Sequence, residues 1–133
     1  LDRMWAAQRK AGDWNWLKCD WPPLEHDDYY GATLAALAAG YAPGGYAASE
    51  AAKAGVEKLR AYFRNTPPPD QHHRAMLLWA STRLDGLMTG DERREAITAL
   101  VTRQRADGGW CLPALGKYTR HDGSANDPDA DSD

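Results

Sequence analysis

The segment Glu25–Asp28 (EHDD) places three carboxylates around one imidazole, in a chain of 133 residues. Because His26 can tune the acidity of neighbouring carboxylates or bind a cation with them, Glu25, Asp27 and Asp28 are the first candidates for chemistry. The segment also stands directly before an uncharged stretch, and Asp residues at such a position are typical of a helix N-terminus. Helix capping by solvated carboxylates is therefore the alternative interpretation.

A second group of carboxylates lies in residues 127–133 (DPDADSD). Its alternate Asp residues, with Asp129 and Asp131 at the centre, are spaced like the first ligands of a calcium loop. However, the sixth position is Ser132 rather than Gly, and no Glu closes the loop. An exposed acidic loop is the simpler interpretation, and we expect neither a bound metal nor a cofactor.

Charge separates the chain into two parts. The net charge is −3, and residues 122–133 contain five Asp and no Lys or Arg, which leaves residues 1–121 near neutral. We expect residues 1–121 to form the folded repeats and residues 122–133 an acidic loop or tail. No basic stretch is interleaved with aromatic residues, so a nucleic-acid partner is not expected. Residues 29–42 are uncharged but too short to cross a bilayer, and membrane association is otherwise not visible in the sequence.

Two stretches share the pattern Gln-x-x-x-Gly-x-Trp, and they lie 96 positions apart, or two steps of 48. Such regular recurrence predicts repeated helical hairpins. A Gln amide near a helix end can stack on an indole and donate to backbone carbonyls, while Gly lets the chain reverse at positive φ. We therefore expect a structural role for the residues of the motif, which are Gln8, Gly12 and Trp14 in the first stretch and Gln104, Gly108 and Trp110 in the second.

Periodicity predicts an all-α fold of about five helices followed by a C-terminal loop or tail. The expected helices are residues 2–11, 29–42, 47–64, 71–87, and a fifth that runs from a capping box at Thr89 to Asp107-Gly108. The first, third and fifth are charged on one side, whereas the second and fourth are nearly uncharged through the middle. We expect the second and fourth helices to lie inside. Trp79 is expected in the core, and a ring that lines a central cavity is its alternative role. A Cys19–Cys111 disulfide would form only if the loops after the two motifs stack, and this stays open.

At its two Gln-x-x-x-Gly-x-Trp stretches the chain resembles the squalene–hopene cyclase and prenyltransferase repeat superfamily. That superfamily builds α/α toroids from alternating inner and outer antiparallel helices. The resemblance implies a partial ring with two inner and three outer helices. It also implies that the remaining toroid repeats are partners of this segment.

The resemblance also gives the carboxylates a role. Cyclases of this kind that protonate their substrate use Asp-x-Asp-Asp before an inner helix, with the middle Asp as the acid. Glu25, Asp27 and Asp28 follow that pattern with Glu in the first place, and Asp129 and Asp131 follow it with Ser132 in the fourth. The implied parent is an acid-initiated polyprenyl cyclase with an isoprenoid substrate, and the segment alone is expected to be inactive.

A non-catalytic α/α-repeat module that binds an extended ligand or a protein partner is the alternative function. The incomplete acid motifs favour it. So does the aromatic content of six Trp and six Tyr against a single Phe, because rings with a polar edge suit half-wet binding surfaces.

Overall fold

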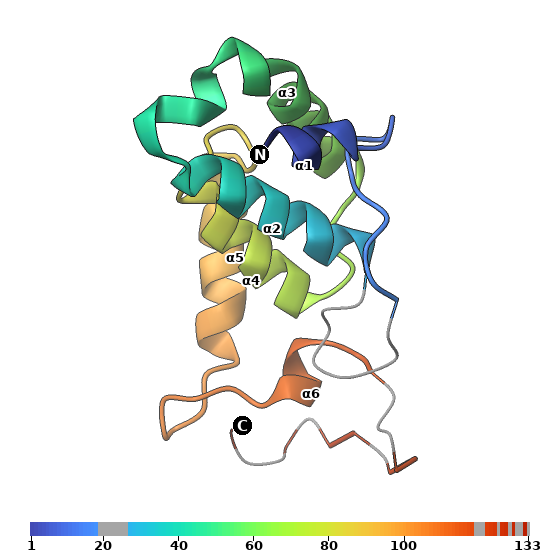
Figure 1. Cartoon of the computed structure of the whole chain (residues 1–133). Helices are drawn as coiled ribbons and strands as arrows, with labels where there is room; N and C mark the ends of the chain where they lie inside the picture. Colours follow the sequence, from blue (N-terminus) through green and yellow to red (C-terminus); the bar gives the residue numbers. More distant parts are fainter. Residues whose placement is uncertain (19–26, 119–121, 125, 128, 130–131, 133) are drawn as a thin grey trace.

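The computed structural model describes residues 1–18, 27–118, 122–124, 126, 127, 129 and 132, and within them the chain forms helices and no strand (Figure 1). The predicted all-α class is therefore confirmed. The elements in chain order are α1 (Asp2–Ala6), α2 (Asp28–Tyr41), the 3-10 helix η1 (Pro43–Ala48), α3 (Glu50–Asn65), α4 (Gln71–Ser81), α5 (Gly90–Thr102) and α6 (Leu112–Leu115).

The helix boundaries differ from the predicted ones at several places. The first helix ends at Ala6 rather than at residue 11, and the fourth ends at Ser81 rather than at residue 87. After α4 the chain turns at Gly86, whose φ is +81°, and Leu84 and Leu87 reach the core from this turn. Apolar spacing alone does not distinguish a buried turn from another helical turn. The short helices η1 and α6 were not predicted, because each spans only a few residues.

Side-chain caps define the first residues of α2, α4 and α5. Asp27 Oδ1 accepts from the Tyr30 backbone N–H at 2.7 Å, and Asp70 Oδ1 accepts from the His73 N–H at 2.9 Å. The predicted capping box at Thr89 is present, with reciprocal bonds between Thr89 and Glu92. Each cap satisfies an N–H group that has no partner inside its own helix, and so fixes where the helix begins.

Helices α2 and α4 lie side by side and run in the same direction (Figure 1). Their first turns meet at His73, which contacts the caps of both helices. At their other ends, a Cβ added at Gly40 would lie 2.5 Å from the carbonyl oxygen of Arg83, just beyond α4. The guanidinium of Arg83 lies 4.4 Å from the centroid of the Tyr41 ring. Because both pairs of ends meet, the two helices are parallel neighbours.

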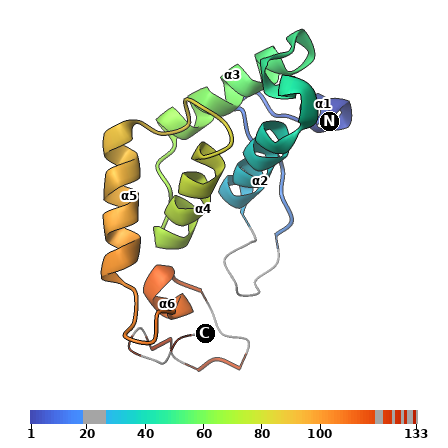
Figure 2. The same cartoon turned by 90° about the vertical axis from the view of Figure 1, so that its left-hand side faces the viewer.

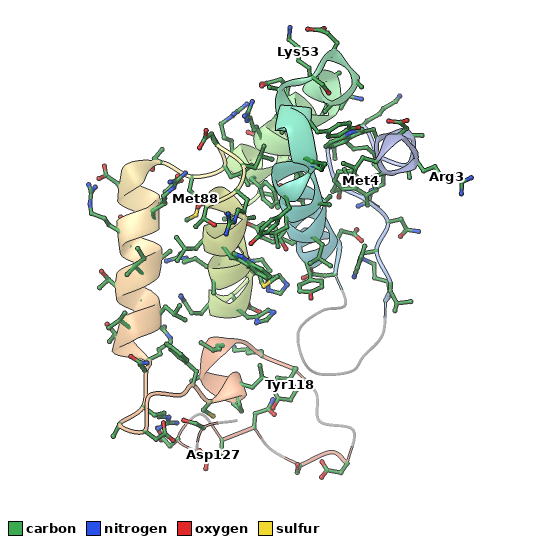
Figure 3. The ribbon with its side chains drawn as sticks, turned by 60° about the vertical axis from the view of Figure 1, so that its left-hand side comes forward. Arg3, Met4, Lys53, Met88, Tyr118 and Asp127 are labelled. Carbon is green, nitrogen blue, oxygen red and sulfur yellow. The ribbon has the colours of Figure 1, made fainter. Side chains whose placement is uncertain are left out.

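The apolar core lies between α2, α3 and α4. The apolar stripe on α3 is buried, with Val56 and Leu59 almost completely removed from solvent. Tyr29 of α2 meets Phe63 of α3 edge-to-face at 5.2 Å between ring centroids. Helix α5 flanks α4 on the side away from α2 (Figure 2), and Met88 lies in the space between α5 and α4 (Figure 3). The fold thus leaves one side of α5 without a neighbouring helix among the described elements.

Two predictions about burial need correction. Trp79 is 49% exposed rather than part of the core, because it lies on the side of α4 opposite to the buried His73 and Leu77. Helix α2 is mostly buried but not on all sides, since Ala38 and Tyr41 are exposed. The lack of charged residues predicted burial for α2 and α4, but one face of each helix is exposed to solvent.

The two Gln-x-x-x-Gly-x-Trp stretches fold into the same structure, which we call the clasp. Each Gln Nε2 donates to the carbonyl of the Gly in its own motif, at 2.9 Å for Gln8 and 2.7 Å for Gln104. Each indole N–H donates back to the preceding helix, from Trp14 to Met4 at 2.7 Å and from Trp110 to Leu100 at 2.8 Å. Gly12 and Gly108 both take positive φ, of +102° and +90°. In both copies the Gln and Trp side chains thus bind the backbone of the turn and of the preceding helix.

The surroundings of the two clasps differ. Gln8 Nε2 also donates to the carbonyl of Gly55 in α3 at 3.0 Å, and a Cβ added at Gly12 would lie 2.2 Å from the Lys58 carbonyl oxygen. A Cβ added at Gly108 would meet nothing within 4 Å. The first clasp is therefore docked on α3, whereas no described helix packs against Gly108 of the second.

This contrast predicts unequal effects for two matched substitutions. Gly12→Ala and Gly108→Ala both place a side chain at positive φ, which costs about 1–2 kcal/mol. Only Gly12→Ala also forces α1 away from α3, so its loss of unfolding free energy should be larger by on the order of 1–3 kcal/mol. Urea denaturation followed by circular dichroism measures both, and equal losses would contradict the docking of the first clasp.

Candidate functional site

His73 lies between the starts of α2 and α4 and is only 2% exposed. Its Nδ1 is 2.7 Å from Asp70 Oδ1, within one turn of the same helix. Its Nε2 forms an ion pair with Asp27 Oδ2 at 3.0 Å, without the alignment of a hydrogen bond. The Tyr29 ring meets the imidazole edge-on at 5.7 Å between centroids. One side chain therefore connects the capping residues of two parallel helices.

The two carboxylates determine the charge of this imidazole. Burial lowers the pKa of His73, but the interactions with Asp27 and Asp70 outweigh burial and raise it to about 9. Burial also raises the pKa of Asp70, yet the hydrogen bonds that this carboxylate accepts from His73 bring it below its usual value. At neutral pH the cluster therefore contains an imidazolium, and it is a buried ion pair network rather than a neutral hydrogen-bond relay.

A cavity of about 580 Å³ opens beside this cluster. Asp27, Asp70 and His73 form one side of it, and Arg103 and Lys117 contribute positive charge. The rest of its lining comes from the loop before α4, from the first residue of α4, and from α6 and its flanks, namely Pro69, Gln71, Pro113, Ala114, Leu115 and Gly116. Its described lining contains no Phe, Tyr or Trp ring, and the charged side chains suit polar or charged groups.

Asp28 is adjacent to Asp27 but serves a different contact. It accepts from the Trp16 backbone N–H at 3.0 Å and forms ion pairs with Lys18 and Arg9. Burial raises the pKa of Asp28, but these hydrogen bonds outweigh burial and lower it to about 2. Asp28 is therefore an ionised anchor that holds the segment after the first clasp onto α2. Only Asp27 of this pair reaches the cavity.

Among the described residues, the remaining predicted site residue is Asp129, and it does not line this cavity. Glu25 and Asp131 lie outside the described residues, so their predicted role is not tested. Asp129 lines a separate hollow beside Arg103 and Gln104, and its N–H donates to Asp127 Oδ1 at 2.9 Å.

The described residues contain no group of three or more His, Cys, Asp or Glu side chains able to hold a metal ion. Two ligands of the considered calcium loop, Asp131 and Asp133, fall outside that part of the chain. Cys111 is a buried free thiol, and Cys19 lies outside the described residues.

His73 was not singled out by the sequence, although a signal was present. Asp70 and His73 are the N-cap of a helix and the residue three positions later, a spacing that lets both side chain and backbone of the second residue bind the cap. The neighbouring His72 instead stacks on Tyr30, at 6.2 Å between centroids and 17° between planes. The two imidazoles therefore face different partners.

A second surface follows the side of α2 and α4 away from α3, and we call it the open face. At its beginning Tyr30 of α2 stacks on His72 of α4, and at its far end Arg83 covers Tyr41. Tyr41 is 52% exposed, and Trp79 is exposed to a similar extent. Because the ring contacts cross between the helices at both ends, these side chains share one surface, which comprises Tyr30, Leu34, Ala38, Tyr41, His72 and Trp79.

Comparison with known proteins adds no relative: no family model, curated protein or solved structure matches the chain. Within the described residues, every helix is too short or too polar to cross a membrane. The site is therefore interpreted from its own geometry.

The His73 cluster predicts a definite dependence of stability on pH. The folded pKa of about 9 lies above the unfolded value of 6.5, so the stabilisation is complete below pH 6.5 and is lost as pH rises through 9. We expect the free energy of unfolding to fall by on the order of 2–3 kcal/mol between pH 6.5 and 10. Urea titrations at successive pH values measure this, with His73→Gln as the control that should remove the slope. An unchanged slope in that variant would contradict the assignment.

Proposed function

We propose that this chain is an arc of an α/α toroid like those of squalene–hopene cyclases and prenyltransferases, with α2 and α4 as inner helices and α1, α3 and α5 as outer ones. The observation that carries this proposal is the repeated clasp, whose hydrogen bonds recur between the same atoms 96 positions apart. The parallel α2–α4 pair supports it, because repeated hairpins place equivalent helices side by side in the same direction.

In such an arc the open face is the part of the wall that meets a ligand. It combines aliphatic side chains with the exposed rings of Tyr41 and Trp79. Aromatic faces bury much apolar area and attract positive charge, so this surface suits an extended isoprenoid chain. An arc of two inner helices covers such a chain on one side only, and the remaining repeats would have to enclose it.

With those repeats the parent protein would be an acid-initiated polyprenyl cyclase. Asp27 is the described carboxylate that fits this role best, since it stands at the start of an inner helix and lines a cavity. Asp131 is the second candidate, on the strength of the sequence alone. The acid would add a proton to a terminal double bond, and aromatic faces of the wall would stabilise the carbocation that results.

A non-catalytic module that binds an extended ligand or protein partner is the second candidate, and the contacts of Asp27 favour it. Its Oδ1 accepts from the Tyr30 N–H, and its Oδ2 faces the His73 imidazolium. A carboxylate whose two oxygens both face donors is arranged to hold negative charge rather than to give up a proton. The described lining of its cavity also contains several charged side chains and no Phe, Tyr or Trp ring to stabilise a carbocation.

The parent protein distinguishes these two functions when it is incubated with squalene. Cyclised products that disappear in Asp27→Asn or Asp131→Asn are the result expected of a cyclase, with a loss of at least a hundredfold for the acid. Gas chromatography with mass spectrometry detects the products. If the parent forms none, and both variants behave like the unaltered protein, the non-catalytic module is the function that remains.

Ligand binding by the open face is testable on the chain itself. Farnesol, a short isoprenoid, should change the intrinsic tryptophan fluorescence, and Trp79→Ala should weaken its binding about five- to thirtyfold through loss of ring contact. Trp110→Phe is the matched control, because Trp110 belongs to the second clasp rather than to the open face. Equal affinities in the two variants would show that farnesol does not bind there.

A further inference from the structure

The side of α5 away from α4 exposes apolar residues on an otherwise charged helix. Ile97 is 50% exposed and Val101 is 58% exposed. Gln104 and Gly108 of the second clasp follow on the same side, and both are exposed. We call these four residues the α5 face.

The first clasp shows what a surface of this kind binds. The positions equivalent to the α5 face, 96 residues earlier, are Leu1, Trp5, Gln8 and Gly12. The Trp5 ring covers Gly55 of α3 so closely that an added Cβ would lie 2.3 Å from it. Gln8 Nε2 donates to the Gly55 carbonyl, and Gly12 lies directly against the Lys58 carbonyl. A glycine and two backbone carbonyls of one helix are therefore what this surface recognises.

The second clasp has the same donor and the same turn without that helix. Among the described residues, Gln104 Nε2 donates to the Gly108 carbonyl and has no second acceptor like Gly55. The space over Gly108 is open to at least 4 Å. Val101 takes the place of Trp5, with its side chain in solvent. The local conformation of the clasp therefore does not depend on the docked helix, and the docking surface is already formed before any helix binds.

We propose that the α5 face docks an α-helix that presents a glycine and its carbonyl to Val101 and Gln104, as α3 presents Gly55 to α1. The occupant is the helix of the next repeat in the parent polypeptide, because the helix that the first clasp binds is the next outer helix of the proposed arc, with Gly55 47 positions after Gln8. This proposal rests on the proposed arc and extends it, because it states which surface joins the arc to its neighbour. It does not depend on any catalytic activity.

A peptide with the sequence of residues 49–66 tests this proposal, because it contains the one helix that the equivalent surface is seen to bind. The full chain is labelled with ¹⁵N, and its amide signals are followed as peptide is added. We expect the amide chemical shifts of residues 97–110 to change on addition of the peptide, and those of other residues to stay the same. Val101→Trp, which restores the ring that Trp5 supplies in the first clasp, should tighten binding about tenfold. A peptide carrying Gly55→Leu is the matched control and should cause no such shifts.

Several results would overturn the proposal. The Gly55→Leu peptide could bind as well as the original, the shifts could fall on residues 1–12 instead, or no shifts could appear even with Val101→Trp. Concentration-dependent shifts of the α5 face without peptide would assign this surface to a second copy of the chain. Farnesol binding is measured at the open face of α2 and α4, so its loss or survival is independent of these outcomes.

Discussion

A glutamine amide that closes a glycine turn is the interaction on which the proposed architecture depends. In each clasp the Gln side chain satisfies a carbonyl that would otherwise be left without a donor where the chain reverses. The following indole then returns to the preceding helix and fixes the angle at which the chain leaves it. Both bonds are local, so the clasp forms in the same way whether or not another helix covers it.

The contact between α1 and α3 shows how a locally formed clasp also makes a tertiary contact. Because Gly55 has no side chain, Trp5 of α1 can pack directly against α3. The second amide hydrogen of Gln8 is donated to the Gly55 carbonyl. A glycine within a helix normally costs about 1 kcal/mol relative to alanine. Here the close packing of the Trp5 ring and the added hydrogen bond offset that cost.

The His73 cluster makes the corresponding joint between α2 and α4. A buried imidazolium between two carboxylates is stable only while both partners are present, because an uncompensated buried charge is costly. The cluster therefore keeps the first turns of the two helices side by side. At their other ends, Gly40 packs against the backbone of Arg83, whose guanidinium covers the Tyr41 ring. This arrangement keeps the two helices parallel and gives them a shared open face. It also fixes Asp27 as part of the structure, and any chemistry of Asp27 must take place within these contacts.

The sequence by itself determined whatever follows from local spacing. It predicted the helical class, a helix cap in the segment that contains Asp27 and the capping box at Thr89, because each depends on residues within a few positions of one another. Tertiary structure alone decided that His73 joins Asp27 to Asp70, that Asp28 instead anchors the segment after the first clasp, and that Trp79 is exposed. These outcomes depend on which faces of α2, α3 and α4 meet, and contacts between distant segments leave no periodic signal in the chain. The same reason explains why two clasps of one sequence pattern differ: among the described elements, a helix packs against the first clasp and none packs against Gly108 of the second.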